Sequence, residues 1–176
     1  MSNPQDSSMI KSITLDNIMP TEKNEKIIKN LCNVGWFLAT EYTSPYKFLM
    51  QDNHLPAGFN YVTHKSAQDK DLNNFAEEVV SKTCEILKIK YKIDRIMWNM
   101  YLTGQNGTVH TDMHTYGYLS FLYNLHTTDG GTEIEDTFLI DKESQVKIFD
   151  SQTKHKGIGP KKDIIRFNLN VVINVL

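Results

Sequence analysis

The sequence contains little cysteine and proline, and neither sign of charge is in excess. Its 176 residues include two cysteines and five prolines, and 19 Lys and Arg stand against 21 Asp and Glu. Cys32 and Cys84 have no metal-type spacing, and although one bridge between them is open, we expect two reduced thiols in a cytoplasmic protein. The balanced charge gives no basic bias toward nucleic acid or membrane, so neither is an expected partner.

Long apolar runs are also missing. No stretch approaches the ~20 residues that span a bilayer, and the opening MSNPQDSSMIKS has neither the basic start nor the hydrophobic core of a secretory signal. With 40% hydrophobic and 23% charged residues, the composition is that of a soluble globular protein. The length suits a single domain over residues 1–176, in which residues 1–10 are expected to be frayed.

Helical periodicity is confined to the first half of the chain. Residues 21–33 have a thin apolar stripe. In residues 71–87, apolar side chains recur from Leu72 to Leu87 at intervals of three and four. The second stripe must pack on a large flat surface, most simply a sheet.

Short β patterns follow residue 90, with turn signals and no helix between them. Counting two earlier ones, they comprise residues 12–16, 36–40, 95–102, 108–112, 118–125, 132–135, 146–149 and 164–175, with turns expected at 104–107 and 129–131. This layout argues against a parallel βαβ sheet and favours an antiparallel sandwich or barrel. The predicted fold class is therefore α+β, mainly β, with N-terminal helices packed on one sheet.

The motif His110-Thr-Asp112 offers two metal ligands. Residues two apart on a strand face the same side, roughly 6–7 Å apart along the backbone, so both side chains can meet one ion. On its own the motif also fits a surface turn or a simple His–Asp hydrogen bond. His114 is in phase with the motif as well, which leaves a D-x-H alternative.

Two further residues strengthen the metal reading. His155 follows the 146–149 strand after a polar loop, and Arg166 lies eleven residues later in the closing strand. Arg166 shares a face with Asn168, and a buried Arg needs an anion, either a protein carboxylate or a carboxylate of a substrate or cosubstrate. Two His and one carboxylate leave three metal positions open, the arrangement used for non-haem Fe(II) and oxygen chemistry.

An ordered set of segments resembles the 2-oxoglutarate/Fe(II)-dependent dioxygenases, specifically their prolyl-4-hydroxylase-like branch. The segments are MYLTGQNGTVHTD, FLYNLHTTDGGTEI, VKIFDSQTKHKGIGP and DIIRFNLNVVI, and they run from about Met97 to Val175. They place a Tyr, a Gly-containing turn, H-x-D, a GG hairpin, a distal His and a strand Arg in the family's order. The resemblance implies a double-stranded β-helix, or jelly roll, with flanking helices.

The resemblance also implies the cofactors and their ligands. The cofactors would be Fe(II), 2-oxoglutarate and O₂, with ascorbate as an optional reductant. His110, Asp112 and His155 match the iron triad of the family.

A second group of residues matches the part of the family site that holds 2-oxoglutarate. Arg166 matches the basic residue that grips the far carboxylate, and Tyr101 matches a tyrosine that assists it. Asn168 falls where several branches have a polar helper. Asn124 stands where some protein hydroxylases carry the second of two tyrosines, so we expect its amide to line the cosubstrate pocket.

The implied activity is hydroxylation of a C–H bond in a peptide or small-molecule substrate, with release of succinate and CO₂. A prolyl or other amino-acid side chain is the first candidate. The alternatives are a small-molecule or nucleobase oxygenase of the same superfamily, and an inert jelly-roll binding protein. RFNLNVV also resembles the alkylation-repair dioxygenases, but Val172 stands where those carry a second Arg. Substrate-selecting residues are expected in the irregular stretch 43–70 and near 113–118.

Overall fold

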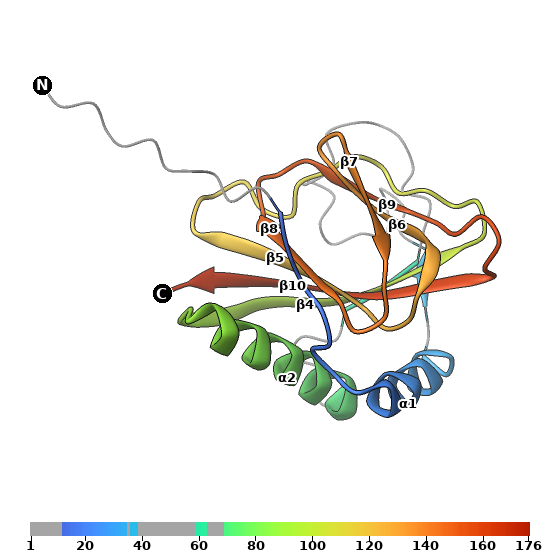
Figure 1. The fold of residues 1–176 in the computed structure, drawn as a ribbon, viewed down its shortest axis with the longest axis horizontal. Helices are drawn as coiled ribbons and strands as arrows, with labels where there is room; N and C mark the ends of the chain where they lie inside the picture. The colour runs from blue at the N-terminus through green and yellow to red at the C-terminus, as the bar shows by residue number, and fades with distance from the viewer. Residues whose placement is uncertain (1–11, 35, 39–58, 63–68) are drawn as a thin grey trace, which may run out of the picture.

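Two antiparallel sheets face each other, and two helices cover the outer side of the larger one (Figure 1). The computed structural model describes residues 12–34, 36–38, 59–62 and 69–176. In chain order the elements are β1 (Ile13–Leu15), α1 (Thr21–Leu31), β2 (Phe37–Leu38), β3 (Phe59–Val62), α2 (Lys70–Leu87), β4 (Tyr91–Leu102), β5 (Tyr118–Asn124), β6 (Thr128–Ile134), β7 (Thr137–Asp141), β8 (Val146–Asp150), β9 (His155–Ile158) and β10 (Ile165–Val175).

The strand order is that of a jelly roll. The larger sheet runs β1-β8-β5-β10-β4-β3-β2 and the smaller one β7-β6-β9. The strand pairs are antiparallel, and most neighbours in the larger sheet are distant in sequence. The chain therefore passes between the two sheets, which stay separate sheets among the strands that the structure describes. This confirms the predicted fold class.

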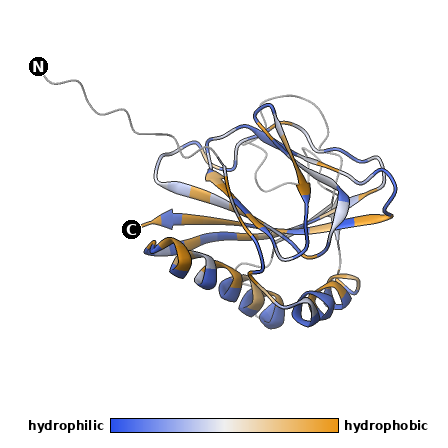
Figure 2. Cartoon of the chain, in the orientation of Figure 1, coloured by the Kyte–Doolittle hydropathy of each residue, from blue (hydrophilic) through white to orange (hydrophobic). Residues whose placement is uncertain are grey.

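Helix α2 packs its apolar side on the larger sheet. Phe75 and Val79 of α2 lie in one buried cluster with Trp98 of β4 and Leu169 of β10. In Figure 2 the hydrophilic parts of both helices lie on the side away from the strands. Burial of side chains of this size stabilises the fold by roughly 1.5–3 kcal/mol each, so the helix is held firmly against the back of the sheet.

Strand β10 is central in the larger sheet and buried on both faces. Phe167 and Leu169 belong to the cluster beneath the helices. The alternate residues Arg166, Asn168 and Asn170 are at most 2% exposed, and Arg166 contacts the smaller sheet. Because side chains alternate along a strand, β10 presents an apolar face to the helices and a polar line to the space between the sheets.

Two expectations about the β structure were wrong. Residues 108–112 form no regular strand, and instead His110 makes an isolated bridge to β9. The stretch 129–131 is not a turn but part of β6, where the register with β7 shifts. A side chain at Gly131 would collide with the Leu139 carbonyl and the Phe138 ring of β7. The glycine is there because two backbones approach closely, and no turn is required.

Some expectations fall outside the described residues. The frayed residues 1–10 lie there, as does the irregular stretch 43–70 apart from β3 and the start of α2. A single domain over residues 1–176 stays a prediction. None of the described helices is both long and apolar enough to cross a bilayer.

Candidate metal centre

The three side chains expected to bind a metal come together at one end of the space between the sheets. One ligand atom from each of His110, Asp112 and His155 can be chosen so that all lie within 4.8 Å of one another. Nε2 of His155 lies 3.5 Å from Oδ2 of Asp112, and the two imidazole centroids are 4.3 Å apart. His114, the alternative ligand, is exposed and lies outside this group.

The backbone holds the two histidines side by side. The amide of each donates to the carbonyl of the other at 2.9 Å, forming an isolated antiparallel bridge between His110 and His155. The amide of Asp112 donates to the Ser151 carbonyl at 2.9 Å. The ligand loop is thus attached to β9 and to the turn before it, which compensates for the missing strand over residues 108–112.

Both imidazoles are oriented by the same kind of hydrogen bond. Nδ1 of His110 lies 2.9 Å from the Thr108 carbonyl, and Nδ1 of His155 lies 2.9 Å from the Thr153 carbonyl. A carbonyl oxygen only accepts, so Nδ1 carries the proton in each ring and Nε2 keeps its lone pair. Nε2 of His155 is buried and has no hydrogen-bond partner among the described residues. Such a nitrogen fits a metal ion.

Asp112 is 1% exposed and surrounded by donors. Arg95 donates to Oδ1, Ser120 Oγ donates to Oδ2 at 2.6 Å, and Asn170 Nδ2 lies 3.2 Å from Oδ2. Burial by itself raises the pKa of the carboxyl, but Arg95, the two imidazoles and Ser120 together hold that pKa well below its usual range. The carboxylate is therefore ionised, as a metal ligand must be, and Arg95 occupies one of its oxygens.

Burial has the opposite effect on a neighbouring histidine. It lowers the pKa of His155 from 6.5 to about 4; His110 adds to this shift and Asp112 opposes it. The imidazole therefore stays neutral and able to bind a metal in mildly acidic solution.

Acid is expected to destabilise the metal-free protein. Between pH 6.5 and about 4 the unfolded state protonates His155 while the folded state does not, so the free energy of unfolding falls as the pH falls. His126, whose pKa is also lowered by burial, acts in the same direction. Urea unfolding at pH 7 and at about pH 5 should show the loss, and His155→Gln should show less of it. An equal loss in that variant would contradict the assignment.

The far end of the inter-sheet space contains a buried ion-pair cluster of Arg166, Asp141 and Lys147. Asp141 Oδ2 accepts from Arg166 Nε at 2.5 Å, and its Oδ1 accepts from Lys147 Nζ at 2.6 Å. Thr132 accepts from Arg166 Nη2 at 3.1 Å. The sequence left two partners open for Arg166, a protein carboxylate or a carboxylate of a substrate or cosubstrate. The structure shows a protein carboxylate, that of Asp141, on one edge of the guanidinium.

Tyr101 contacts Arg166 through its ring face. The guanidinium carbon lies 5.0 Å from the ring centroid, which is within cation–π range. Gly157 of β9 gives the phenol its room, because a Cβ there would collide with the ring and its oxygen. Burial raises the pKa of Tyr101, with Arg166 opposing, so the hydroxyl stays protonated and can donate to an anion.

A row of three amides crosses the larger sheet beside this end. Asn99, Asn168 and Asn124 face one another in register across β4, β10 and β5. With its amide turned so that its oxygen faces the guanidinium, Asn168 accepts from Arg166 Nη2 at 2.7 Å. Asn124 is fully buried, and neither of its amide atoms has a partner among the described residues. Unpaired buried amides are rare, so this one points to a bound polar group.

Arg95, Asp141 and Lys147 were not identified from the sequence. Arg95 and Lys147 sit inside strand patterns that read as ordinary half-exposed β structure. Asp141 ends β7, a short edge strand with no clear pattern of its own. The one signal that could have identified them is a charged residue at an inward-facing strand position. Such a position can be recognised only when the strand register is known.

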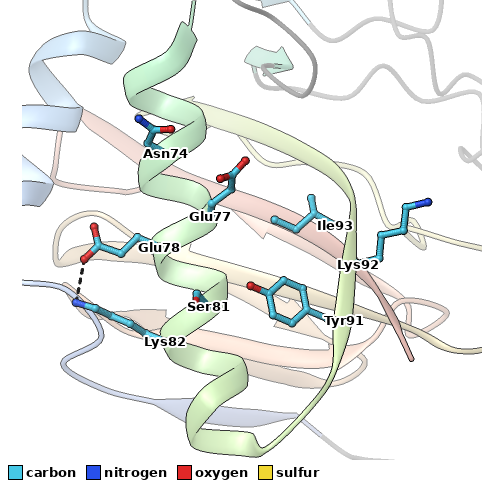
Figure 3. Close-up of a pocket in the computed structure, with 8 residues that line it drawn as sticks. All are labelled: Asn74, Glu77, Glu78, Ser81, Lys82, Tyr91, Lys92 and Ile93. Carbon is cyan, nitrogen blue, oxygen red and sulfur yellow. Dashed lines mark ion pairs between the residues drawn. The ribbon is translucent and has the colours of Figure 1, made fainter.

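A depression outside the two sheets does not resemble a site. It lies between α2 and the start of β4 and has a volume of about 670 Å³. Figure 3 shows Glu77 and Glu78 on its helical side and Lys92 turned away from them. Glu78 already pairs with Lys23 at 2.6 Å and Lys82 at 3.1 Å. Glu78 is thus already neutralised by surface lysines, and the charged side chains here do not converge on a common point.

Comparison with known proteins gives likeness in structure alone. No family model matches the chain, and no curated protein matches its sequence significantly. The viral collagen prolyl hydroxylase vCPH from Paramecium Bursaria Chlorella virus-1, in its 2OG complex, is similar at a TM-score of 0.62 and 15% identity over 94% of this chain and 96% of that one. HygX from Streptomyces hygroscopicus with nickel and 2-oxoglutarate bound gives 0.68 and 8% identity, over 93% and 82%.

A third solved structure is similar in fold as well. The prolyl-4-hydroxylase of Pseudomonas putida is similar at a TM-score of 0.63 and 10% identity, over 93% of this chain and 91% of that one. The chain therefore has the jelly-roll fold of 2-oxoglutarate/Fe(II)-dependent oxygenases, prolyl hydroxylases among them. The resemblance stated from the sequence is confirmed at the level of fold, and the His110, Asp112 and His155 group fits an Fe(II) site within it.

Proposed function

We propose that the protein is an Fe(II)- and 2-oxoglutarate-dependent dioxygenase that hydroxylates a C–H bond. The observation that carries the proposal is the convergence of His110, Asp112 and His155, which can place one ligand atom each within 4.8 Å of one another. Two imidazoles and one ionised carboxylate are a suitable donor set for Fe(II) and leave coordination positions for other ligands. The similarity to structures with bound 2-oxoglutarate supports the same reading.

The chain's own residues would position and shield the reactants. His110, Asp112 and His155 would hold the metal, with Arg95 and Ser120 keeping Asp112 in place. With Fe(II), 2-oxoglutarate and O₂ bound, the site would supply oxidative decarboxylation to succinate and CO₂ coupled to hydroxylation of the substrate.

The polar residues at the far end would bind the cosubstrate. Arg166 would hold the far carboxylate of 2-oxoglutarate, and Tyr101 would donate to it. Asn168 would orient the guanidinium, and the orphaned amide of Asn124 would bind the cosubstrate directly. Since these residues are buried between the sheets, water would be kept from the reacting groups.

The substrate we propose first is a prolyl or other amino-acid side chain, in a peptide or free. The support is the resemblance of the site segments to the prolyl-4-hydroxylase-like branch and the similarity in fold to two prolyl hydroxylases. We also propose a reducing, cytoplasmic setting, which the unbridged thiols of Cys32 and Cys84 support.

Succinate formation tests the proposed function. The protein would be incubated with Fe(II), ascorbate, 2-oxoglutarate and air, with and without proline-containing peptides, free amino acids or other small molecules. We expect slow succinate release that the correct substrate accelerates, and none in His155→Ala. Absence of 2-oxoglutarate turnover in the iron-loaded wild type under all these conditions would overturn the proposal.

A further inference from the structure

The ion-pair cluster at the far end of the inter-sheet space has unequal charge. Arg166 and Lys147 are 0% exposed and Asp141 is 1% exposed. Asp141 is the one carboxylate that pairs with either cation among the described residues. Two cations and one anion leave one positive charge in a place that water does not reach, which is unfavourable unless a ligand supplies the counter-charge.

A second observation indicates where that ligand lies. The fully buried Asn124 amide has no partner for its nitrogen or its oxygen among the described residues. Asn124 is in register with Asn168, whose oxygen faces the Arg166 guanidinium. The surplus positive charge of the cluster and the unpartnered Asn124 amide thus lie on neighbouring strands, on the same inner face of the larger sheet.

The two cations differ in how fully protein groups occupy them. Arg166 is held by Asp141, Thr132 and Asn168 and stacks on Tyr101. Lys147 donates to Asp141 at 2.6 Å and to the Leu139 carbonyl at 2.9 Å. An ammonium has three N–H groups, so one N–H of Lys147 is left without a partner among the described residues.

We propose that Asp141 determines the ligand specificity of this end: it neutralises one of the two buried cations and leaves one positive charge, shared by Lys147 and Arg166, for a single carboxylate. This inference rests on the proposed function, because the carboxylate is the far one of 2-oxoglutarate. Lys147 is then a second anchor of the cosubstrate, and Asp141 acts through its negative charge, which sets the net charge at this end.

The charge balance makes opposite predictions for three variants. Lys147→Met leaves Asp141 to neutralise Arg166, so the net charge becomes zero and the carboxylate loses its counter-charge. Asp141→Asn/Lys147→Met returns the net charge to plus one, and the amide oxygen can still accept from Arg166. Asp141→Asn alone leaves two uncompensated cations and should attract the carboxylate more strongly.

Calorimetric binding of 2-oxoglutarate to the Ni(II)-loaded protein measures these effects without turnover. We expect Lys147→Met to weaken binding by at least about tenfold. The double variant should restore most of that loss, and Asp141→Asn should bind no more weakly than the wild type. The half-buried pair Lys156 and Glu133, 2.9 Å apart on the smaller sheet, gives a matched control: Lys156→Met and Glu133→Gln should leave binding unchanged.

The outcomes separate this inference from the proposed function. If the Ni(II)-loaded wild type binds no 2-oxoglutarate, the proposed function fails and the inference fails with it. If the wild type binds but Lys147→Met binds equally well, or the double variant shows no recovery, the inference alone is overturned. Urea unfolding of each variant identifies a folding defect. Should Lys147→Met not fold, Asp141→Asn decides, because weaker binding in that variant contradicts the charge argument.

Discussion

Replacing Asp112 by alanine is expected to abolish Fe(II) binding and to lower the free energy of unfolding of the metal-free protein by about 3–5 kcal/mol. The first effect follows from the loss of the anionic member of the triad. The second follows because Arg95, which is 5% exposed, would lose its ion pair with this carboxylate while remaining buried. Iron titration and urea unfolding measure the two effects separately.

The double variant Asp112→Ala/Arg95→Met is the control for this prediction. Removing both members of the Arg95–Asp112 ion pair leaves neither charge buried without the other, so we expect much of the lost stability to return while iron binding stays absent. Arg95→Met alone leaves Ser120 and Asn170 on the carboxylate and should fold less stably but still bind iron. Iron binding that survives in the double variant would show that Asp112 is not a ligand.

Replacing Arg166 by methionine is expected to weaken 2-oxoglutarate binding by about 10²-fold or more while leaving metal binding nearly intact. Each charge-assisted hydrogen bond to the far carboxylate contributes about 1.5–3 kcal/mol, and two of them account for a loss of this size. The fold should tolerate the change, because Asp141 keeps its 2.6 Å ion pair with Lys147. Binding of 2-oxoglutarate and of Fe(II) would each be titrated.

An exposed cation near the start of β10 provides the comparison. Lys161→Met removes the same charge from the surface and should change the affinity for 2-oxoglutarate by less than about twofold, since exposed charges are well screened. Loss of Fe(II) binding in Arg166→Met, with 2-oxoglutarate affinity otherwise retained, would mean that Arg166 supports the metal centre and does not hold the cosubstrate.

The fold was predictable because its main elements have strong periodicity. The stripe from Leu72 to Leu87 predicted α2, and the alternation in the last strand predicted both faces of β10. The small sheet was harder, because β7 and β9 are four or five residues long. Their positions are set by pairing with β6, and this pairing is not encoded in the local sequence pattern of either strand.

The site residues that belong to an ordered motif could be predicted from the sequence. Those that reach the site only through the strand register could not. His110 and Asp112 are two residues apart, and the resemblance supplied His155. Arg95 lies opposite Val172 in the β4–β10 register, so the cation that reaches Asp112 comes from a neighbouring strand. That relation exists only once the strands have paired.

The mutual hydrogen bonds between His110 and His155 couple metal affinity to the closing of the small sheet. The two imidazoles belong to segments far apart in sequence, and their spacing exists only after β9 has docked. An ion that binds this folded arrangement and not the open chain would stabilise it by mass action, by about 2.7 kcal/mol at a hundred times its dissociation constant. Iron supply would then govern how long the protein survives in the cell as well as how fast it works.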